Sequence, residues 1–174
     1  MPESRRIEHQ EIEAAIERLA TGIKARLASK RRLFLLGIAN GGIELAKRIA
    51  PQVPGGTVGT LDISFHRDDI GRHPIPKEFS PTFIPGDVNG ADVILVDDVL
   101  FSGRTVKAAL DELFDHGRPA HVGLAVLVDR GGRKLPIAAD FCGITLSAAP
   151  AEKVVVTLDP SDPTKDSILI RPGS

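Results

Sequence analysis

Apolar residues along the chain alternate between helical spacing and continuous runs. Near the start they recur every three or four positions, which predicts an amphipathic helix of about five turns. The residues of this first stripe are Ile12, Ile16, Leu19, Ile23 and Leu27. Continuous apolar runs at 33–38, 91–96 and 122–128 are typical of strands buried on both faces. Between them, helical spacing predicts helices over 43–50 and 105–114.

Shorter apolar segments complete the pattern. Residues 57–65 alternate as a strand does, and further short strands are predicted at 137–142, 153–158 and 168–170. Strands that alternate with helices indicate an α/β fold, with a mostly parallel sheet and helices on both faces. A length of 174 residues suits one domain with a sizeable core. We therefore expect a single domain over 1–174, with ligands bound beyond the carboxyl ends of its strands.

A long polar tract interrupts this pattern at about 67–86. It contains several prolines and glycines and has mixed charge. Segments of this length without secondary structure are often lids over active sites. The tract therefore predicts a flexible flap.

Composition and charge narrow the class of protein. The net charge of −1 argues against binding nucleic acid by overall electrostatics alone. The single cysteine, Cys142, excludes an intramolecular disulfide and indicates a reducing compartment. No apolar run reaches the roughly 18 residues that span a bilayer, and the N-terminus lacks the apolar core of a signal peptide. We expect a cytoplasmic protein with no membrane contact.

Residues 93–105 join an apolar strand to two carboxylates and a turn of small residues before a helix. Asp97 and Asp98 end the strand and suit the hydroxyls of a sugar. The turn consists of Ser102, Gly103, Arg104 and Thr105. The first amides of a helix have no internal partner and carry partial positive charge, so a phosphate fits there. The segment predicts a loop that binds a sugar phosphate.

Two alternatives to this loop are weaker. An ordinary strand–loop–helix with a capping aspartate would leave unpaired charge at a buried strand end, which is costly. A phosphoryl-transfer or metal site has no support from a Gly-Lys-Ser/Thr P-loop or a Cys/His cluster, so no metal site held by the protein is predicted.

A second turn follows the strand at 33–38. Asn40, Gly41 and Gly42 separate this strand from the next helix. Paired glycines let backbone amides point into an anion site, although a plain tight turn is the slightly favoured explanation of these residues alone.

The segment 93–105 resembles the 5-phosphoribosyl-1-diphosphate (PRPP) signature of type I phosphoribosyltransferases, with apolar residues, two acids and a small-residue loop that ends in Thr. The wider sequence resembles the PyrR family, which comprises pyrimidine-operon attenuation proteins with uracil phosphoribosyltransferase activity. The segments that carry this resemblance are 62–69, 96–106, 117–119, 124–131 and 152–154. It extends from the first helix to Leu158.

The resemblance implies the type I phosphoribosyltransferase fold and the reaction of uracil with PRPP to give UMP and diphosphate, with Mg²⁺ carried by PRPP. Asp97 and Asp98 would be catalytic and hold the ribose hydroxyls, while 102–105 would hold the 5-phosphate. Arg67, on the flap, would be catalytic at the leaving diphosphate. Asp129 and Arg130 would lie near the base in a small hood at about 128–158. The family also implies a homodimer or a dimer-based tetramer.

Departures from the family pattern affect two functions. The diphosphate loop of the family, Lys-Thr-Arg-Gly, is Ala39-Asn40-Gly41-Gly42 here, and losing one such donor can cost about 100-fold in rate. Several Lys, His, Arg and Thr positions of the RNA-binding face are also lost, while Arg18, Arg26 and Arg133 remain. PRPP binding is therefore expected more firmly than RNA attenuation.

Three hypotheses about function stay open. The first is a uracil phosphoribosyltransferase that also regulates pyrimidine biosynthesis. The second is a sensor of UMP or PRPP, and of RNA, with little turnover. The third is a phosphoribosyltransferase for another base.

Overall fold

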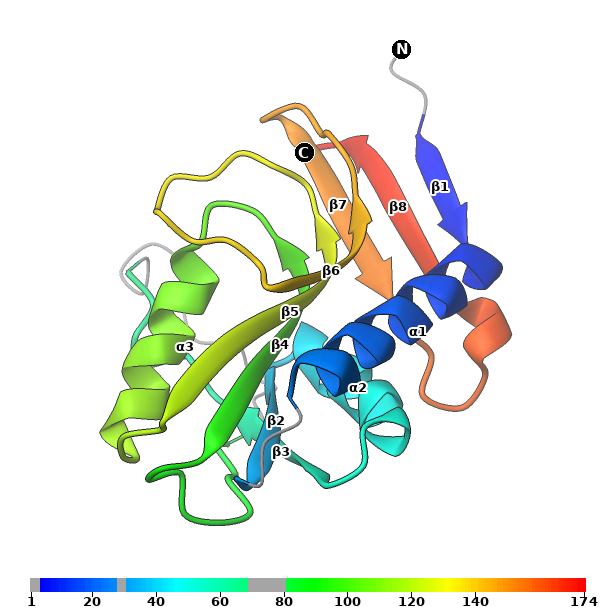
Figure 1. The fold of residues 1–174 in the computed structure, drawn as a ribbon. Helices are drawn as coiled ribbons and strands as arrows, with labels where there is room; N and C mark the ends of the chain where they lie inside the picture. Colours follow the sequence, from blue (N-terminus) through cyan, green and yellow to red (C-terminus); the bar gives the residue numbers. More distant parts are fainter. Residues whose placement is uncertain (1–3, 28–30, 69–80) are drawn as a thin grey trace.

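A parallel sheet forms the centre of the molecule. The computed structural model describes residues 4–27, 31–68 and 81–174. The strands of this sheet are β2 (Leu33–Ile38), β3 (Gly56–Leu61), β4 (Asp92–Leu100), β5 (His121–Asp129) and β6 (Phe141–Thr145). They pair in the order β3-β2-β4-β5-β6, and every pair is parallel (Figure 1). The predicted mostly parallel α/β fold is confirmed.

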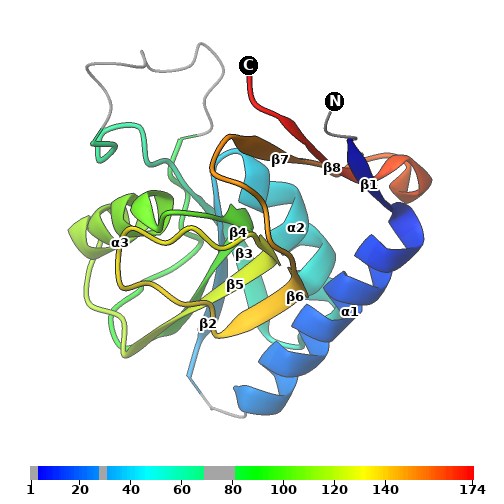
Figure 2. The ribbon, with the colours of Figure 1, turned by 90° about the horizontal axis from the view of Figure 1, so that it is seen from above.

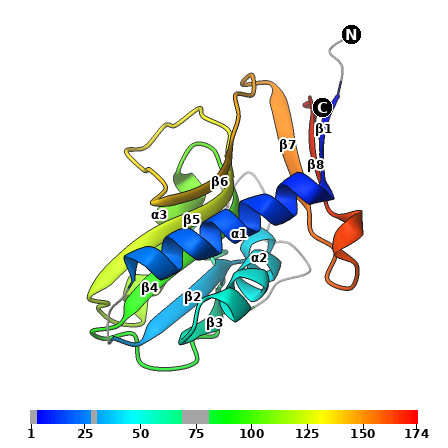
Figure 3. The same ribbon diagram turned by 45° about the vertical axis from the view of Figure 1, so that its right-hand side comes forward.

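Helices cover both faces of this sheet. On one face lie α1 (His9–Arg26) and α2 (Gly41–Ile49), which is followed by a 3₁₀ turn at Ala50–Gln52, and on the other lies α3 (Arg104–Asp115). Figure 2 shows the sheet between the two layers, and Figure 3 shows α1 and α2 beside each other. Alternate strand residues are buried against each layer, which explains the continuous apolar runs. No helix in the described parts of the chain is long and apolar enough to cross a membrane.

A small antiparallel sheet stands beside the parallel one and contacts it where β7 meets β4 (Figure 1). Its strands are β1 (Arg5–Glu8), β8 (Ser167–Pro172) and β7 (Glu152–Thr157), in that order, and a 3₁₀ turn at Pro163–Lys165 precedes β8. Pairing of Arg5 with Ile170 brings the two ends of the chain together. We call this sheet the hood. The expected hood range 128–158 supplies only β7, because β6 belongs to the parallel sheet and β1 and β8 complete the hood.

Some predicted strand boundaries are wrong. The strand expected at 137–142 is β6 at 141–145, because Ile137 and Ala139 pack into the core under α3 without pairing in the sheet. The strand expected at 57–65 ends at Leu61. In contrast, β4 runs beyond the predicted 91–96 to Leu100, so the two acids lie within the strand.

The central part of the predicted flap, 69–80, lies outside the described residues. Both of its ends are described. The returning end is held by an antiparallel bridge in which Thr60 and Phe83 exchange backbone hydrogen bonds of 2.8 Å.

Candidate active site

Asp97 and Asp98 form an acid pair near the end of β4. The Asp97 side chain is buried and accepts a hydrogen bond of 2.9 Å from the amide of Asp98. Asp98 is half-buried, and its Oδ1 accepts a bond of 2.8 Å from the amide of Val99. Burial, and then the neighbouring Asp98 carboxylate, raise the pKa of the Asp97 carboxyl well above its usual value. The pair can therefore both donate and accept hydrogen bonds.

The glycine turn lies directly against this acid pair. A Cβ on Gly41 would overlap the carboxylate of Asp98, and a Cβ on Gly42 would overlap the carbonyl oxygen of Val96. Glycine at 42 thus permits the approach of α2 to the backbone of β4, and glycine at 41 leaves the Asp98 carboxylate in its place. The positive end of the α2 dipole is thereby brought next to the carboxylates. Asn40, which precedes the helix, is exposed and is joined to Ala39 by a cis peptide bond.

The second predicted phosphate-binding element also stands at a helix N-terminus. Gly103, at φ +96°, makes the turn from β4 into α3, a conformation that side chains disfavour. The hydroxyl oxygen of Ser102 accepts a bond of 3.2 Å from the amide of Arg104, and Thr105 is exposed in the first turn. The structure thus brings 97–98, 40–42 and 102–105 to one end of the sheet.

The flap base contributes charge at the same end. The guanidinium of Arg104 forms an ion pair of 2.6 Å with Asp68, so it links the 102–105 turn to the start of the flap. Arg67, the neighbour of Asp68, is half-buried. Its predicted role at the diphosphate stays a prediction, because most of the flap lies outside the described residues.

Asp129 is held by a neighbouring arginine. At the end of β5, it pairs with Arg133 at 2.5 Å and accepts a bond of 3.0 Å from the amide of Gly131. Burial raises the pKa of Asp129, but the bonds from Arg133 and Gly131 outweigh it and lower the pKa below its usual value. The carboxylate therefore stays charged and directed toward its own loop.

Arg130 forms part of the wall between the acid pair and the hood. Its side chain is 5% exposed and donates bonds of 2.9 and 2.8 Å to the carbonyls of Ala149 and Glu152. The guanidinium also stacks over the ring of Phe101 at 3.9 Å. Its Nε is buried and has no partner among the described residues. The side chain is thus occupied by hood carbonyls and by Phe101, and its predicted contact with a base stays a prediction.

Comparison with known proteins identifies the family. Residues 5–159 match the phosphoribosyl transferase domain family. The chain is 46% identical to the Bifunctional protein PyrR of Chloroflexus aurantiacus, over 92% of this chain and 91% of that protein. It is 44% identical to the Bifunctional protein PyrR of Bacillus velezensis, over 91% of both chains. The chain belongs to the PyrR family. This confirms the resemblance carried by residues 62–154.

Solved structures agree on the fold of this PyrR-family chain. A hypoxanthine-guanine phosphoribosyltransferase from Bacillus anthracis superposes with a TM-score of 0.70 at 18% identity, over 98% of this chain and 99% of that chain. At this identity the likeness concerns the fold alone. The type I phosphoribosyltransferase fold is confirmed.

The three arginines predicted at an RNA face of this PyrR-family chain do not gather in one place. Arg133 donates bonds of 2.8 and 2.9 Å to the carbonyls of Ile137 and Phe101, at the carboxyl ends of the strands. Arg18, on α1, donates bonds of 2.7 and 3.3 Å to the carbonyl of Gly143. Arg133 is thus occupied in joining loops of its own chain.

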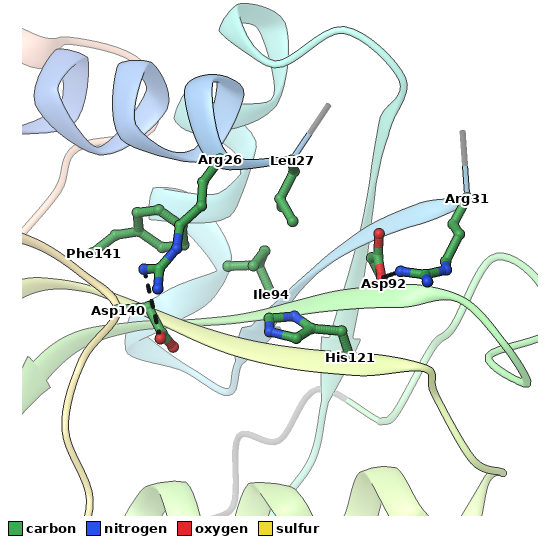
Figure 4. Close-up of a pocket in the computed structure, with 8 residues that line it drawn as sticks. All are labelled: Arg26, Leu27, Arg31, Asp92, Ile94, His121, Asp140 and Phe141. Atoms are coloured by element: carbon green, nitrogen blue, oxygen red, sulfur yellow. Dashed lines mark hydrogen bonds and ion pairs between the residues drawn. The ribbon is translucent and has the colours of Figure 1, made fainter. Parts of the chain in front are cut away.

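Arg26 lies at the opposite end of the parallel strands from Arg133, near their amino ends. It faces Asp140 at 3.8 Å and the ring of Phe141 at 5.6 Å, beside a pocket of about 280 Å³ (Figure 4). Asp92 and His121, at the amino ends of β4 and β5, line the same pocket. Arg26 and Arg133 therefore lie at opposite ends of the parallel strands.

An open groove of about 600 Å³ adjoins the acid pair and was not predicted. It runs between the end of β4 and the hood, and its lining includes Val99, Phe101, Arg130, the segment 150–155, Gly173 and Ser174. The valines of β7 fit the pattern of an ordinary strand, so the hydrophobic periodicity does not reveal that they line a groove. The available signal was Phe101, a large apolar residue in a loop, which is 39% exposed.

Proposed function

We propose that the protein transfers the phosphoribosyl group of PRPP to uracil, which gives UMP and diphosphate. One observation carries the proposal: the acid pair adjoins the N-terminal ends of two helices, α2 at Gly41 and α3 at Gly103. PRPP has phosphate groups at both ends of a ribose, and helix N-termini bind such anions. The carboxylates are then placed for the ribose hydroxyls between them.

The proposed roles follow from this arrangement. Asp97 and Asp98 hold the ribose 2′ and 3′ hydroxyls. The 5-phosphate binds at Ser102 to Thr105, and the diphosphate with its Mg²⁺ binds at Asn40 to Gly42. The C1–O bond breaks with its electron pair on diphosphate, N1 of uracil bonds to C1, and the N1 proton passes to water. The site acts mainly by fixing both substrates in reacting geometry.

We place the base in the groove between β4 and the hood. Val99 and Phe101 offer apolar contact directly after the acid pair, where C1 of the ribose would lie. Arg130 supports the ring of Phe101 from its buried side. Asp129 orders the loop through Arg133, so both predicted base-site residues would act by shaping the groove.

Turnover is expected to be lower than in relatives with the Lys-Thr-Arg-Gly loop. Ala39 and Gly41 replace its cationic residues, and the backbone amides of the turn remain. Arg67 is the proposed replacement at the diphosphate, because it begins the flap beside the Asp68–Arg104 pair. One missing donor accounts for a loss of about 100-fold in rate.

A regulatory role is proposed because both relatives carry the name Bifunctional protein PyrR. In a homodimer or dimer-based tetramer in the cytoplasm, Arg26 would be the arginine offered to RNA, since its side chain is exposed whereas Arg18 and Arg133 donate to carbonyls of their own chain. Uracil, UMP and PRPP would then be the small molecules that the protein senses.

The test is product formation from PRPP, Mg²⁺ and a panel of uracil, hypoxanthine and guanine. UMP alone is expected. A purine nucleotide would redirect the proposal to another base, and PRPP binding with no product would leave a sensor. Asp98→Asn should weaken PRPP binding at least about tenfold, whereas Asp111→Asn, on the exposed side of α3, serves as the matched control. Unchanged PRPP binding in Asp98→Asn would remove the acid pair from the site.

A further inference from the structure

A histidine and two carboxylates converge where the flap leaves the body of the molecule. The Nε2 atom of His66 lies 3.1 Å from Oε2 of Glu112 and 2.9 Å from Oδ2 of Asp115. The three ligand atoms all lie within 4.8 Å of one another. Glu112 and Asp115 are three positions apart on α3, so they share one face of the helix.

A single proton on Nε2 of His66 cannot bond well to both carboxylates. An imidazole Nε2 carries at most one hydrogen, yet two carboxylate oxygens lie at hydrogen-bond distance from it. Zinc binds nitrogen and carboxylate oxygen at about 2.0–2.2 Å, which puts neighbouring ligand atoms roughly 3.0–3.5 Å apart. The distances from His66 to both carboxylates are close to this spacing. A cation at their centre would satisfy all three groups at once.

Neighbouring side chains orient the carboxylate of Glu112. Its other oxygen, Oε1, accepts a bond of 2.7 Å from the hydroxyl of Thr82 and lies 3.1 Å from Nε2 of His116. Thr82 in turn accepts a bond of 2.8 Å from the amide of Asp62. Such partners behind the ligands are typical of metal sites, where they fix ligand orientation.

We propose that His66, Glu112 and Asp115 bind a divalent transition-metal ion of the zinc class, with His116 behind Glu112 as a partner that orients its carboxylate. Imidazole together with carboxylate selects such ions, whereas Mg²⁺ prefers oxygen ligands and retained water. The site is therefore separate from the Mg²⁺ carried by PRPP. Sequence spacing hides it, because His66 and Glu112 are 46 positions apart.

The bound ion joins both described ends of the flap to α3. His66 lies on the outgoing end, and Thr82, on the returning end, is bonded to the ligand Glu112. In the free protein these contacts are hydrogen bonds of a partly exposed cluster. With metal, the same residues are held by coordinate bonds, so the protein should become more resistant to heat.

The experiment is titration of the metal-stripped full chain with Co²⁺, followed by Zn²⁺ competition. We expect a visible Co²⁺ absorption band at one ion per chain, displaced by Zn²⁺, and a higher melting temperature with Zn²⁺. His66→Gln and Asp115→Asn should each weaken binding at least about tenfold. His121→Gln, which changes another surface histidine away from the cluster, is the matched control.

No absorption band, or equal Co²⁺ affinity in wild type, His66→Gln and Asp115→Asn, would overturn the proposal. Loss of binding in His121→Gln alone would also overturn it, because the ion would then sit in the pocket near Arg26. Circular dichroism of each variant without metal checks that the fold is kept. None of these measurements depends on phosphoribosyl transfer, so their outcome is independent of the enzyme activity.

Discussion

Gly41 is the residue on which the meeting of the diphosphate turn and the acid pair depends. A methyl group at this position would overlap the Asp98 carboxylate and displace it. Gly41→Ala should therefore weaken binding of Mg²⁺–PRPP at least about tenfold, while the exposed helix start tolerates alanine with little loss of stability. Calorimetric titration with PRPP measures this. Gly22→Ala, whose Cβ would meet only the Phe141 ring at 3.2 Å, is the control. Equal PRPP affinity in both variants would contradict the assignment.

Asp97 is a buried carboxyl whose ionisation opposes folding. Its raised pKa means that the folded state keeps its proton where the unfolded chain, with a pKa of about 4, has lost it. Stability therefore falls as pH rises from about 4 toward the folded pKa, and the cost is complete above it. Asp97→Asn should be more stable than wild type by about 0.5–2 kcal/mol at neutral pH, at the expense of activity.

Urea unfolding of wild type and Asp97→Asn across this pH range tests whether the stability of the wild type falls, relative to the variant, as pH rises. Well below pH 4 the Asp97 carboxyl is protonated in the folded and in the unfolded state, so its ionisation no longer opposes folding and the two proteins should converge. A variant that is less stable at about pH 8 than wild type would show that the Asp97 carboxylate is satisfied in the fold.

At the scale of elements, the connection from β5 to β6 supports the 102–105 turn. The carbonyl of Ser102 accepts bonds of 2.9 and 3.1 Å from the amides of Lys134 and Leu135. A Cβ on Gly103 would lie 3.0 Å from Ile137, so this connection packs directly on the turn. Arg133 binds carbonyls on both sides of the contact. It is therefore the side chain that fixes one loop against the other.

Arg133→Ala should lower the free energy of unfolding by about 1.5–3 kcal/mol, because it removes charged hydrogen bonds to Phe101, Ile137 and Asp129. PRPP affinity should fall as well, since the turn loses its support. Lys134→Ala removes an exposed neighbouring charge and is the control. If Arg133→Ala leaves both stability and PRPP binding unchanged, the arginine does not support the 102–105 turn.

Elements formed by neighbouring residues could be predicted from the sequence. The continuous apolar run of β4, the acids at 97–98 and the turn at 102–105 are contiguous, so their pattern alone predicts both the strand and a sugar-phosphate loop after it; the strand is confirmed and the loop's ligand stays a prediction. Contacts between distant segments could not be predicted in this way. β1 is a short polar strand that exists because Arg5 pairs with Ile170.

Arg130 illustrates the same limit at the candidate site. Its local sequence, Asp-Arg-Gly-Gly, is typical of an exposed turn, yet the side chain is buried. The carbonyls of Ala149 and Glu152 and the ring of Phe101 receive it, and all come from other segments of the chain. Burial of an arginine depends on such partners, and sequence spacing does not reveal them.

At the scale of the whole molecule, α2 connects the proposed diphosphate site to the hood. Its first residues, Gly41 and Gly42, lie against β4, and its last turn carries Arg48. Arg48 pairs with Asp166 through both of its terminal nitrogens and donates a bond of 2.6 Å to the carbonyl of Asp159. Both partners belong to the connection between β7 and β8. One short helix thus holds the site at one end and the hood at the other.

Arg48→Ala should be the most destabilising of these changes, because Asp166 is 3% exposed and would lose its counter-charge. Breaking a buried pair from one side costs about 3–5 kcal/mol. The hydrogen bond to Asp166 is the largest cause that raises the pKa of Arg48, so the guanidinium stays charged at every accessible pH. Urea unfolding at neutral pH measures the loss, and Lys47→Ala, an exposed neighbour on the same helix, is the control.

A double variant separates lost charge pairing from lost packing. In Arg48→Met with Asp166→Asn, the apolar part of the side chain is kept and no buried charge remains, so stability should recover relative to Arg48→Met alone. No recovery would mean that the bond from Arg48 to the carbonyl of Asp159, which both variants lose, makes the main contact with the hood. A loss below about 1 kcal/mol in Arg48→Ala would place this pair among weak surface contacts and leave the contact of β7 with β4 to attach the hood.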